Sequence, residues 1–179
     1  MSENRKLSME ELGRLTPEEA ESAVKTPVII ILDNVRSMHN VGSVFRTADA
    51  FLVEEIILCG ITPVPPHREI NKTALGATET VKWQHCSDAI QKLQDLRSKG
   101  YKVIAAEQTA MSIKLHEAKF STNEKYAVIL GNEVDGVNQE LIDLADYSLE
   151  IPQAGTKHSL NISVAAGVVC WELFRQLRG

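Results

Sequence analysis

The chain has 179 residues, of which 44% are apolar and 24% are charged. This length suits a single domain of about 150 residues, and the composition is too apolar for a disordered chain. Nineteen Lys and Arg residues against 24 Asp and Glu residues give a formal net charge of -5, which argues against a protein that coats phosphates with its whole surface. A local groove of cations that binds nucleic acid remains compatible with this charge.

The cysteine pattern and the apolar pattern narrow the class further. Cys59, Cys86 and Cys170 are far apart in the sequence and have no CxxC or Cys/His ligand spacing, so neither a disulfide framework nor a zinc site is expected. Residues 1–15 contain no apolar signal core, and no run approaches the ~20 apolar residues of a membrane span. We therefore expect a cytoplasmic protein with no membrane partner and no bound metal.

Residues 1–27 are predicted to form a helical extension before the main domain, residues 28–179. Thr16-Pro17-Glu18-Glu19 places an N-cap hydroxyl, a proline at the first helical position and a Glu three residues after the cap, which together make a capping box. Pro27 is expected to end this helix.

From Val28 onward, short β-branched runs alternate with amphipathic segments. Strands are predicted at residues 28–32, 54–60, 101–107, 125–131 and 147–151. Helices are predicted at residues 41–51, 69–76, 87–98, 138–145 and 161–177. This alternation indicates an α/β domain with a mostly parallel sheet flanked by helices, a class in which ligands bind beyond the carboxyl ends of the strands.

The last predicted helix is apolar around nearly its whole circumference until Glu172 and Arg175. Such a helix is buried on more than one side. In so small a domain, either a second subunit covers one side, which gives a homodimer through the C-terminal helix, or the monomer buries the helix by itself. The sequence favours the two explanations about equally.

Three polar loops are the candidates for a functional site, since no GxxxxGK[ST], GxGxxG, HExxH or GxSxG motif occurs. The first loop follows the strand at 28–32. Asn40 is expected to cap the next helix, and Gly42 permits a close approach of backbone or ligand. Arg46 has a simple explanation as an ion-pair partner of Asp49 at i+3.

The second loop follows the strand at 125–131, where Gly131 and Gly136 bracket an amide and two carboxylates. This composition suits a tight turn that presents backbone groups to a ligand, or a plain turn with a solvated Glu. In the third loop, Ser159 and Asn161 both precede the final helix. Capping explains either residue, but it explains the pair less easily.

Together the loops read Asn40-x-Gly42-x3-Arg46, Gly131-Asn132-Glu133-x2-Gly136 and Ile151-Pro152-x2-Gly155-x3-Ser159-Leu160-Asn161-x-Ser163, in this order. In these motifs the sequence resembles the SpoU/TrmH family of RNA ribose 2'-O-methyltransferases, within the SPOUT superfamily, over residues 28–177. The resemblance implies a C-terminal trefoil knot, S-adenosylmethionine as cofactor, and tRNA or rRNA as substrate. It also implies a homodimer with its active site at the subunit interface.

The resemblance implies roles for individual residues by motif position. Catalytic or RNA-binding places fall on Asn40, Arg46, Glu133, Ser159 and Asn161. Cofactor contacts fall on Glu107, Leu130, Gly131, Asn132, Ile151, Gln153, Ser159 and Leu160. Gln153 departs from the family pattern, in which Met often follows Ile-Pro.

The chemistry expected of Arg46 follows from its guanidinium, whose pKa above ~12 makes it a reluctant base. We expect Arg46 to bind RNA phosphate and to stabilise a developing alkoxide, and its role as the proton acceptor stays open. Glu133 is expected to orient Arg46 or Asn40 through a charge-assisted hydrogen bond. Ser159 and Asn161 are expected to bind the target nucleotide or to fix the third loop.

Residues 60–83 are the best candidate for an RNA-facing segment, because they contain His67, Arg68, Lys72 and Lys82 together with Trp83. Cations contact phosphates and a planar ring stacks on a base. A structural proline-rich connection with Trp83 in the core is at least as good an explanation. Longer family members carry a separate RNA-binding domain, so substrate selection here is expected to use the catalytic domain, the N-terminal helix or another protein.

Two alternatives to ribose methylation remain. One is a non-catalytic RNA-binding or assembly factor with the same fold. The other is an RNA methyltransferase that modifies a base nitrogen from the same cofactor pocket.

Overall fold

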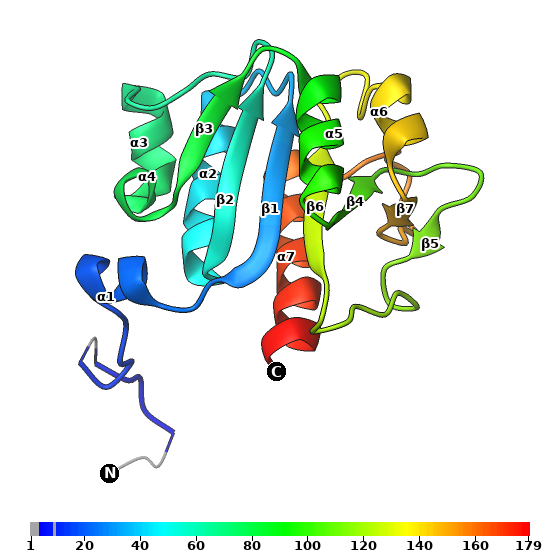
Figure 1. Cartoon of the computed structure of the whole chain (residues 1–179). Coiled ribbons are helices and arrows are strands. Elements are labelled where there is room, and N and C mark those ends of the chain that lie inside the picture. Colours follow the sequence, from blue (N-terminus) through cyan, green and yellow to red (C-terminus); the bar gives the residue numbers. More distant parts are fainter. Residues whose placement is uncertain (1–3, 9) are drawn as a thin grey trace.

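A seven-stranded sheet, parallel throughout, forms the centre of the molecule (Figure 1). The computed structural model describes residues 4–8 and 10–179. The strand order is β3-β2-β1-β6-β4-β7-β5. The strands are β1 (Thr26–Asp33), β2 (Val53–Cys59), β3 (Trp83–Cys86), β4 (Tyr101–Ala106), β5 (Ile113–Lys114), β6 (Lys125–Leu130) and β7 (Tyr147–Glu150).

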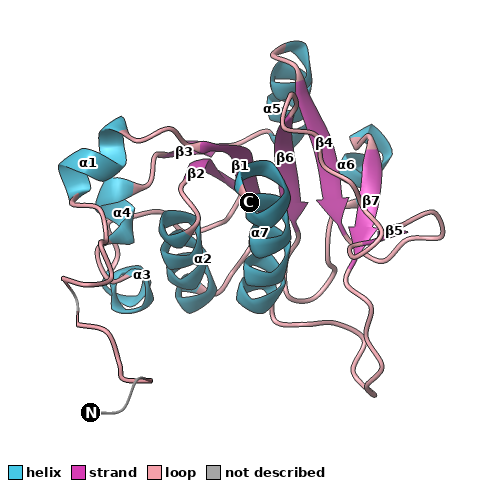
Figure 2. Ribbon diagram, turned by 90° about the horizontal axis from the view of Figure 1, so that it is seen from below, coloured by secondary structure: helices cyan, strands magenta, loops and turns pink. Residues whose placement is uncertain are grey.

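Helices cover both faces of this sheet. They are α1 (Pro17–Ser22), α2 (Met38–Ala50), α3 (Arg68–Ala74), α4 (Ala77–Thr80), α5 (Ala89–Ser98), α6 (Gln139–Leu144) and α7 (Ile162–Arg178). Figure 2 shows α2 and α7 side by side on one face, with α5 and α6 on the other. Helix α1 lies apart from the sheet and contacts α4.

The central strand shows why the first apolar run has no polar alternation. Ile30 and Leu32 pack into the core under α2 and α7, whereas Ile29 and Ile31 pack into the core under α5 and α6. A strand covered on both faces must be apolar at every position. The predicted α/β class with a parallel sheet is therefore confirmed.

The sheet order places the loops that follow the strands. From β1 the chain proceeds through β2 to β3 at one edge, and β6, β4 and β7 lie on the other side of β1. The strand order thus reverses between β1 and β6. Ligands of open α/β sheets bind at such a switch point, beyond the carboxyl ends of the strands.

Several predicted boundaries were wrong for local reasons. Helix α1 ends at Ser22, and Pro27 lies inside β1 at a register irregularity, where a strand tolerates proline. The capping box at Thr16 is present as predicted. The helix predicted at 69–76 ends at Ala74, because Leu75 and Gly76 both have positive φ angles, 50° and 91°, and a separate helix, α4, begins at Ala77.

The sequence pattern also missed two short strands, β3 and β5. β3 has four residues and β5 has two, which is too short for a periodic signal. Among the described residues, none of the helices combines the length and apolar character that a membrane crossing requires.

Candidate functional site

The three polar loops meet at the carboxyl edge of the sheet and are joined by side-chain hydrogen bonds. The Asn40 amide donates to Glu133 Oε1 at 2.9 Å, and the Asn161 amide donates to Asn40 Oδ1 at 3.1 Å. Asn40 is almost fully buried. One residue from each loop therefore takes part in a single chain of contacts, which we call the Asn40–Glu133–Asn161 network.

Asn40 acts in this network and not as a helix cap. Helix α2 begins at Met38, and its cap is Ser37, whose hydroxyl accepts from the Asn40 backbone N–H at 3.3 Å. The predicted capping role of Asn40 was therefore wrong, because a hydroxyl three residues earlier takes that place. The Asn40 side chain is thereby free to bridge the other two loops.

Glu133 lies at the N-terminal end of α2. Its two carboxylate oxygens accept from the backbone N–H groups of Arg36 and Ser37, each at 3.2 Å, in addition to the Asn40 amide. Partial burial acts to raise the pKa of Glu133, but these hydrogen bonds outweigh it and the pKa lies below its ordinary value. The residue is therefore ionised at neutral pH and orients Asn40. No contact joins it to Arg46.

Asn161 has a second function in the same place. It is the N-cap of α7, and its side-chain oxygen accepts from the Ser163 backbone N–H at 2.9 Å and from the Ser163 hydroxyl at 2.7 Å. Of the two candidate caps in the third loop, Asn161 is the one that caps. Ser159 is exposed and lines the cavity described below.

The second loop is a tight turn held by its own asparagine. The Asn132 side-chain oxygen accepts from the backbone N–H groups of Val134 and Asp135, both at 2.9 Å, and Asn132 pairs with Gly136 through backbone hydrogen bonds. A Cβ on Gly131 would lie 1.9 Å from the Gly136 carbonyl carbon. Only glycine permits this approach of the two ends of the turn.

Glu107, from the end of β4, fixes the other side of the turn. Its Oε2 accepts from the Val137 backbone N–H at 3.1 Å, and its Oε1 accepts from the Gln108 backbone N–H at 2.9 Å. Gly136 has a φ of +71°, and a Cβ there would lie 2.2 Å from Glu107 Oε2. The carboxylate therefore supports the turn as well as facing the cavity.

A cavity of about 680 Å³ lies between these loops, within the usual size range of a small-molecule site. All eight residues expected to contact a cofactor line it. They are Glu107, Leu130, Gly131, Asn132, Ile151, Gln153, Ser159 and Leu160. Glu133 and Asn161 of the network line it too.

Sequence reasoning missed the part of the lining that comes from regular elements. Ile142 of α6, Leu149 of β7 and Ala165 of α7 line the cavity. Each belongs to an apolar pattern that reads as ordinary core, so no sequence signal distinguishes it. His158 also lines the cavity, and its backbone carbonyl accepts from the Gln108 side chain at 3.1 Å.

The cavity is acidic. Four carboxylates line it, those of Glu107, Glu133, Asp135 and Glu150, and its described lining contains no Lys or Arg. A site of this charge favours a cationic ligand.

Two expected catalytic residues do not line the cavity: Asn40, which contacts Glu133 and Asn161 at its edge, and Arg46. Arg46 is exposed on α2, and within the described part of the chain its side chain makes no hydrogen bond or ion pair. The expected pairing with Asp49 was wrong, since the Asp49 carboxylate accepts instead from the Thr80 hydroxyl at 2.6 Å.

Helices α2 and α7 run side by side in the same direction. Asn40 contacts Asn161 at their N-terminal ends, and the Phe51 ring that follows α2 lies 5.9 Å from Trp171 and 5.5 Å from Phe174. The outward face of α7 carries a stripe of exposed apolar residues at helical spacing: Val164, Val168 and Trp171, exposed by 51%, 37% and 52%. The monomer therefore does not bury the helix on all sides. We call this surface the α7 stripe.

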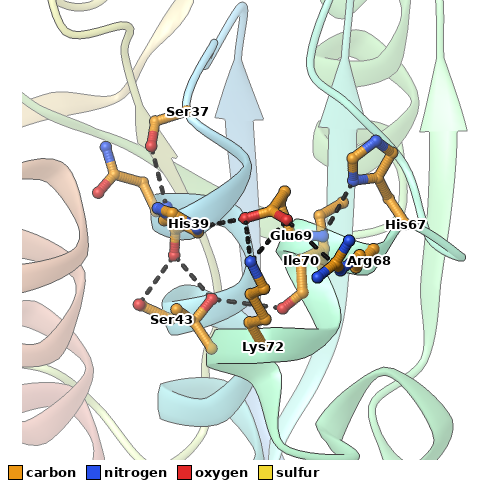
Figure 3. Close-up of polar contacts among 10 residues, drawn as sticks. Ser37, His39, Ser43, His67, Arg68, Glu69, Ile70 and Lys72 are labelled. Atoms are coloured by element: carbon orange, nitrogen blue, oxygen red, sulfur yellow. Dashed lines mark hydrogen bonds and ion pairs between the residues drawn. The ribbon is translucent and has the colours of Figure 1, made fainter.

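Of the cations in residues 60–83, Arg68 and Lys72 lie at the Glu69 carboxylate (Figure 3), whereas Lys82 lies 3.7 Å from Glu55. Glu69 of α3 accepts from Lys72 at 2.7 Å and contacts His39 of α2 at 2.9 Å, which ties the two helices together. The Arg68 side chain is 84% exposed. Trp83 lies in β3, half-buried and packed on the core, so the structural explanation holds for this ring.

The chain matches a known family over most of its length. The model of the SpoU rRNA Methylase family matches residues 27–171. The chain is 31% identical over 156 residues to the 23S rRNA (guanosine-2'-O-)-methyltransferase RlmB of Neisseria meningitidis, covering 87% of this chain and 61% of that protein. It is 30% identical over 155 residues to the tRNA (guanosine(18)-2'-O)-methyltransferase of Aquifex aeolicus, covering 83% and 69%. The chain thus spans less than two thirds of the first relative.

Solved structures resemble the fold closely. The TrmH/SpoU tRNA modifying enzyme of A. aeolicus has a TM-score of 0.78 at 28% identity, covering 89% of this chain and 79% of that one. The AdoMet-bound rRNA methyltransferase of Sinorhizobium meliloti has a TM-score of 0.79 at 28% identity, covering 91% and 60%. A C-terminal trefoil knot is typical of this fold.

Proposed function

Because the chain belongs to the SpoU rRNA methylase family, we propose that it transfers a methyl group from S-adenosylmethionine to a ribose 2'-hydroxyl of tRNA or rRNA. The observation that carries this proposal is the acidic cavity beyond the carboxyl ends of β4, β6 and β7, beside the Asn40–Glu133–Asn161 network that joins the three motif loops. The named relatives from N. meningitidis and A. aeolicus support the ribose as the methylated group.

The cavity suits S-adenosylmethionine by size and charge. Leu130, Ile151 and Leu160 offer apolar side chains for the flat base, and the backbone groups around Gly131 supply hydrogen bonds. The carboxylates favour the positive charge of the sulfonium. We assign Glu107, Asn132, Gln153 and Ser159 to the same pocket, as motif position implies.

When bound, the cofactor supplies a methyl group on a positively charged sulfur, which is electrophilic. The contribution of the chain is to place the sugar oxygen in line with that methyl and to exclude water. The network holds the three loops together. Ser159 and Asn161 contact the target nucleotide. Arg46 binds the neighbouring phosphate and stabilises the negative charge that develops on the oxygen.

The position of Arg46 supports a site that two subunits share. Arg46 is exposed on α2 and does not line the cavity of its own chain. We propose that two copies associate through the α7 stripe, so that Arg46 of one subunit completes the cavity of the other. The apolar stripe supplies the surface that drives association.

Cations on α2 and α3 complete the proposed RNA surface. Arg68 and Lys72 are well exposed, and the His39–Glu69 contact holds α3 against the start of α2. These groups make phosphate contacts that position the RNA without reading its sequence. We propose that residues 28–179 form the methyltransferase domain, that residues 1–27 form an extension of it, and that the protein acts on RNA in the cytoplasm.

The decisive experiment combines methyl transfer with product analysis. Purified protein, labelled S-adenosylmethionine and total RNA from a strain that lacks the gene should give one labelled nucleoside carrying a 2'-O-methyl group. A label on a base nitrogen would favour a base methyltransferase. Absence of label, with RNA binding intact, would favour a non-catalytic RNA-binding factor.

A mixing experiment tests the shared site. Arg46→Ala removes the residue donated to the partner, whereas Leu160→Arg places a cation in the pocket and blocks the cofactor. If the site is shared, an equal mixture that exchanges subunits regains about one quarter of wild-type activity, because half the dimers are mixed and each has one intact site. If each subunit used its own Arg46, the mixture would stay inactive.

A further inference from the structure

A pair of cysteines lies at the same edge of the sheet, outside the proposed pocket. Cys59 ends β2 and Cys86 ends β3, and the two residues are direct partners in the parallel register. Their sulfur atoms are 2.8 Å apart. The pair escaped the sequence analysis because 27 residues separate its members.

The backbone geometry at this position suits a disulfide. Neighbouring strands lie about 4.8 Å apart, and the Cα atoms of disulfides are usually 4.4–6.8 Å apart. The side chains of in-register partners in a parallel pair point to the same face of the sheet. A bond between the two sulfur atoms therefore requires only a small movement of the strands.

One of the two thiols is accessible and activated. Cys59 is fully buried, whereas Cys86 is half-buried and lines a shallow surface cleft with His85 and Lys92. The hydrogen bond with Cys59 and, to a smaller extent, the nearby Lys92 ammonium lower the pKa of Cys86 below that of an ordinary thiol. Cys86 is thus the thiol that an oxidant in solution reaches first.

Backbone contacts connect this pair to the first motif loop. The Cys59 carbonyl accepts from the Asn34 backbone N–H at 3.3 Å and from the Thr62 hydroxyl at 2.7 Å. The Val35 backbone N–H in turn donates to that same hydroxyl at 3.0 Å. The next two residues, Arg36 and Ser37, are those whose N–H groups hold Glu133.

We propose that Cys59 and Cys86 are a reversible redox site. A hydroperoxide oxidises the pair to a disulfide, and this change alters the hydrogen bonds from the first loop to Glu133. The Cys86 thiolate attacks the peroxide, becomes a sulfenic acid and releases hydroxide. The Cys59 sulfur then attacks the sulfenic sulfur, so that the S–S bond forms and water leaves. Two thiols lose two electrons and two protons, and the peroxide is reduced to water. A dithiol reductant reverses the reaction.

The disulfide is tested by intact mass spectrometry of the reduced, full-length protein after treatment with hydrogen peroxide. The expected result is a loss of two hydrogen atoms, restored by dithiothreitol, with the linked peptides carrying Cys59 and Cys86. Cys86→Ser and Cys59→Ala should not show this loss, and circular dichroism verifies that each variant is folded. Cys170 is an internal control, since it is buried in α7 and should stay reduced. Stable addition of oxygen to Cys86 without a disulfide overturns the proposal.

The coupling to the site is tested by hydrogen exchange in the peptide that contains Arg36 and Ser37. Oxidation should change its exchange rate by about threefold or more, as expected for a local change in loop stability. Equal rates in the oxidised and reduced protein would overturn the coupling. The proposal concerns regulation of the proposed active site and so rests on that function, but neither measurement uses methyl transfer, and the two can therefore fail separately.

Discussion

The acidic cavity and the α2–α7 face differ in how far one chain completes them. The cavity is closed by contacts within the chain: Asn132 holds the turn, Glu107 holds its far side, and the network joins the three loops. On the α2–α7 face, by which we mean the exposed surface of these two helices, the Arg46 side chain makes no hydrogen bond or ion pair within the described residues, and Trp171 is 52% exposed. The supporting contacts of the cavity are therefore complete within one chain, whereas the polar contacts of Arg46 on the α2–α7 face are not.

Because of this difference, we expect cofactor binding and methyl transfer to depend on different parts of the molecule. Every residue that we expect to contact the cofactor lines one cavity of a single chain. In the proposed function, transfer to RNA also depends on Arg46, which does not line that cavity. Changes on the α2–α7 face should therefore affect turnover and assembly, whereas changes in the turn should affect stability and cofactor affinity.

The largest effect is expected from Arg46→Ala. Loss of one group that stabilises developing charge should lower single-turnover methylation by about 100-fold or more, while calorimetry should find S-adenosylmethionine affinity unchanged. Arg46→Lys should retain part of the rate, since it keeps the charge without the planar fork. Lys99→Ala, at the end of α5, is the control for loss of a surface cation. Near-normal rates in both Arg46 variants would refute a chemical role for Arg46.

A comparable effect on assembly is expected from Trp171→Glu. A charge in place of the aromatic ring of the α7 stripe should weaken self-association by about 2 kcal/mol or more, as for an aromatic anchor that is buried at an interface. Sedimentation velocity at micromolar concentration measures this change. Met111→Glu is the matched control, because Met111 is 87% exposed and lies far from α7 in the sequence. If Trp171→Glu remains as dimeric as the wild type, the α7 stripe is not the interface.

Gly136→Ala should act on the turn and leave the α2–α7 face intact. The positive φ and the clash with Glu107 are expected to cost about 1–3 kcal/mol of folding stability, with weaker binding of S-adenosylmethionine. Chemical denaturation measures the first and calorimetry the second. Gly155→Ala provides the comparison, since a Cβ there meets no atom within 4 Å and should leave the unfolding midpoint unchanged. Equal stability in both variants would contradict the assigned turn geometry.

The smallest effect concerns pH and Glu133. Because its folded pKa lies below the ordinary value, Glu133 contributes stability that is complete at neutral pH and disappears as the pH falls through the folded pKa. Glu133→Gln should therefore be less stable than the wild type at pH 7, and the difference should shrink below the ordinary pKa of about 4.3. Urea unfolding across this range measures it, with Glu21→Gln on the exposed face of α1 as the control. If the unfolding free energies of the wild type and Glu133→Gln differ by the same amount at all pH values, ionisation of Glu133 does not contribute to stability as proposed.

Much of the fold was predictable because a strand that is buried on both faces is apolar at successive positions, and this pattern is visible in the local sequence. The runs at 28–32 and 127–130 are continuously apolar, and they lie in the central strands β1 and β6. β3 has no such apolar run, because its four residues are only partly buried or exposed at an edge of the sheet. Asn40 was misread as a cap for a related reason, since Ser37 and Asn40 are both good caps and the local sequence does not decide between them.

The sequence by itself determined the α/β class, the three motif loops and the residue types that line much of the cavity. Those features depend on local composition and on the period of the apolar residues. Only the tertiary structure decided that Asn40 contacts Glu133 and Asn161, that Arg46 does not line the cavity of its own chain, and that Cys59 contacts Cys86. These pairings join residues that are 27 to 121 positions apart, and strand order, which local sequence does not encode, brings them together.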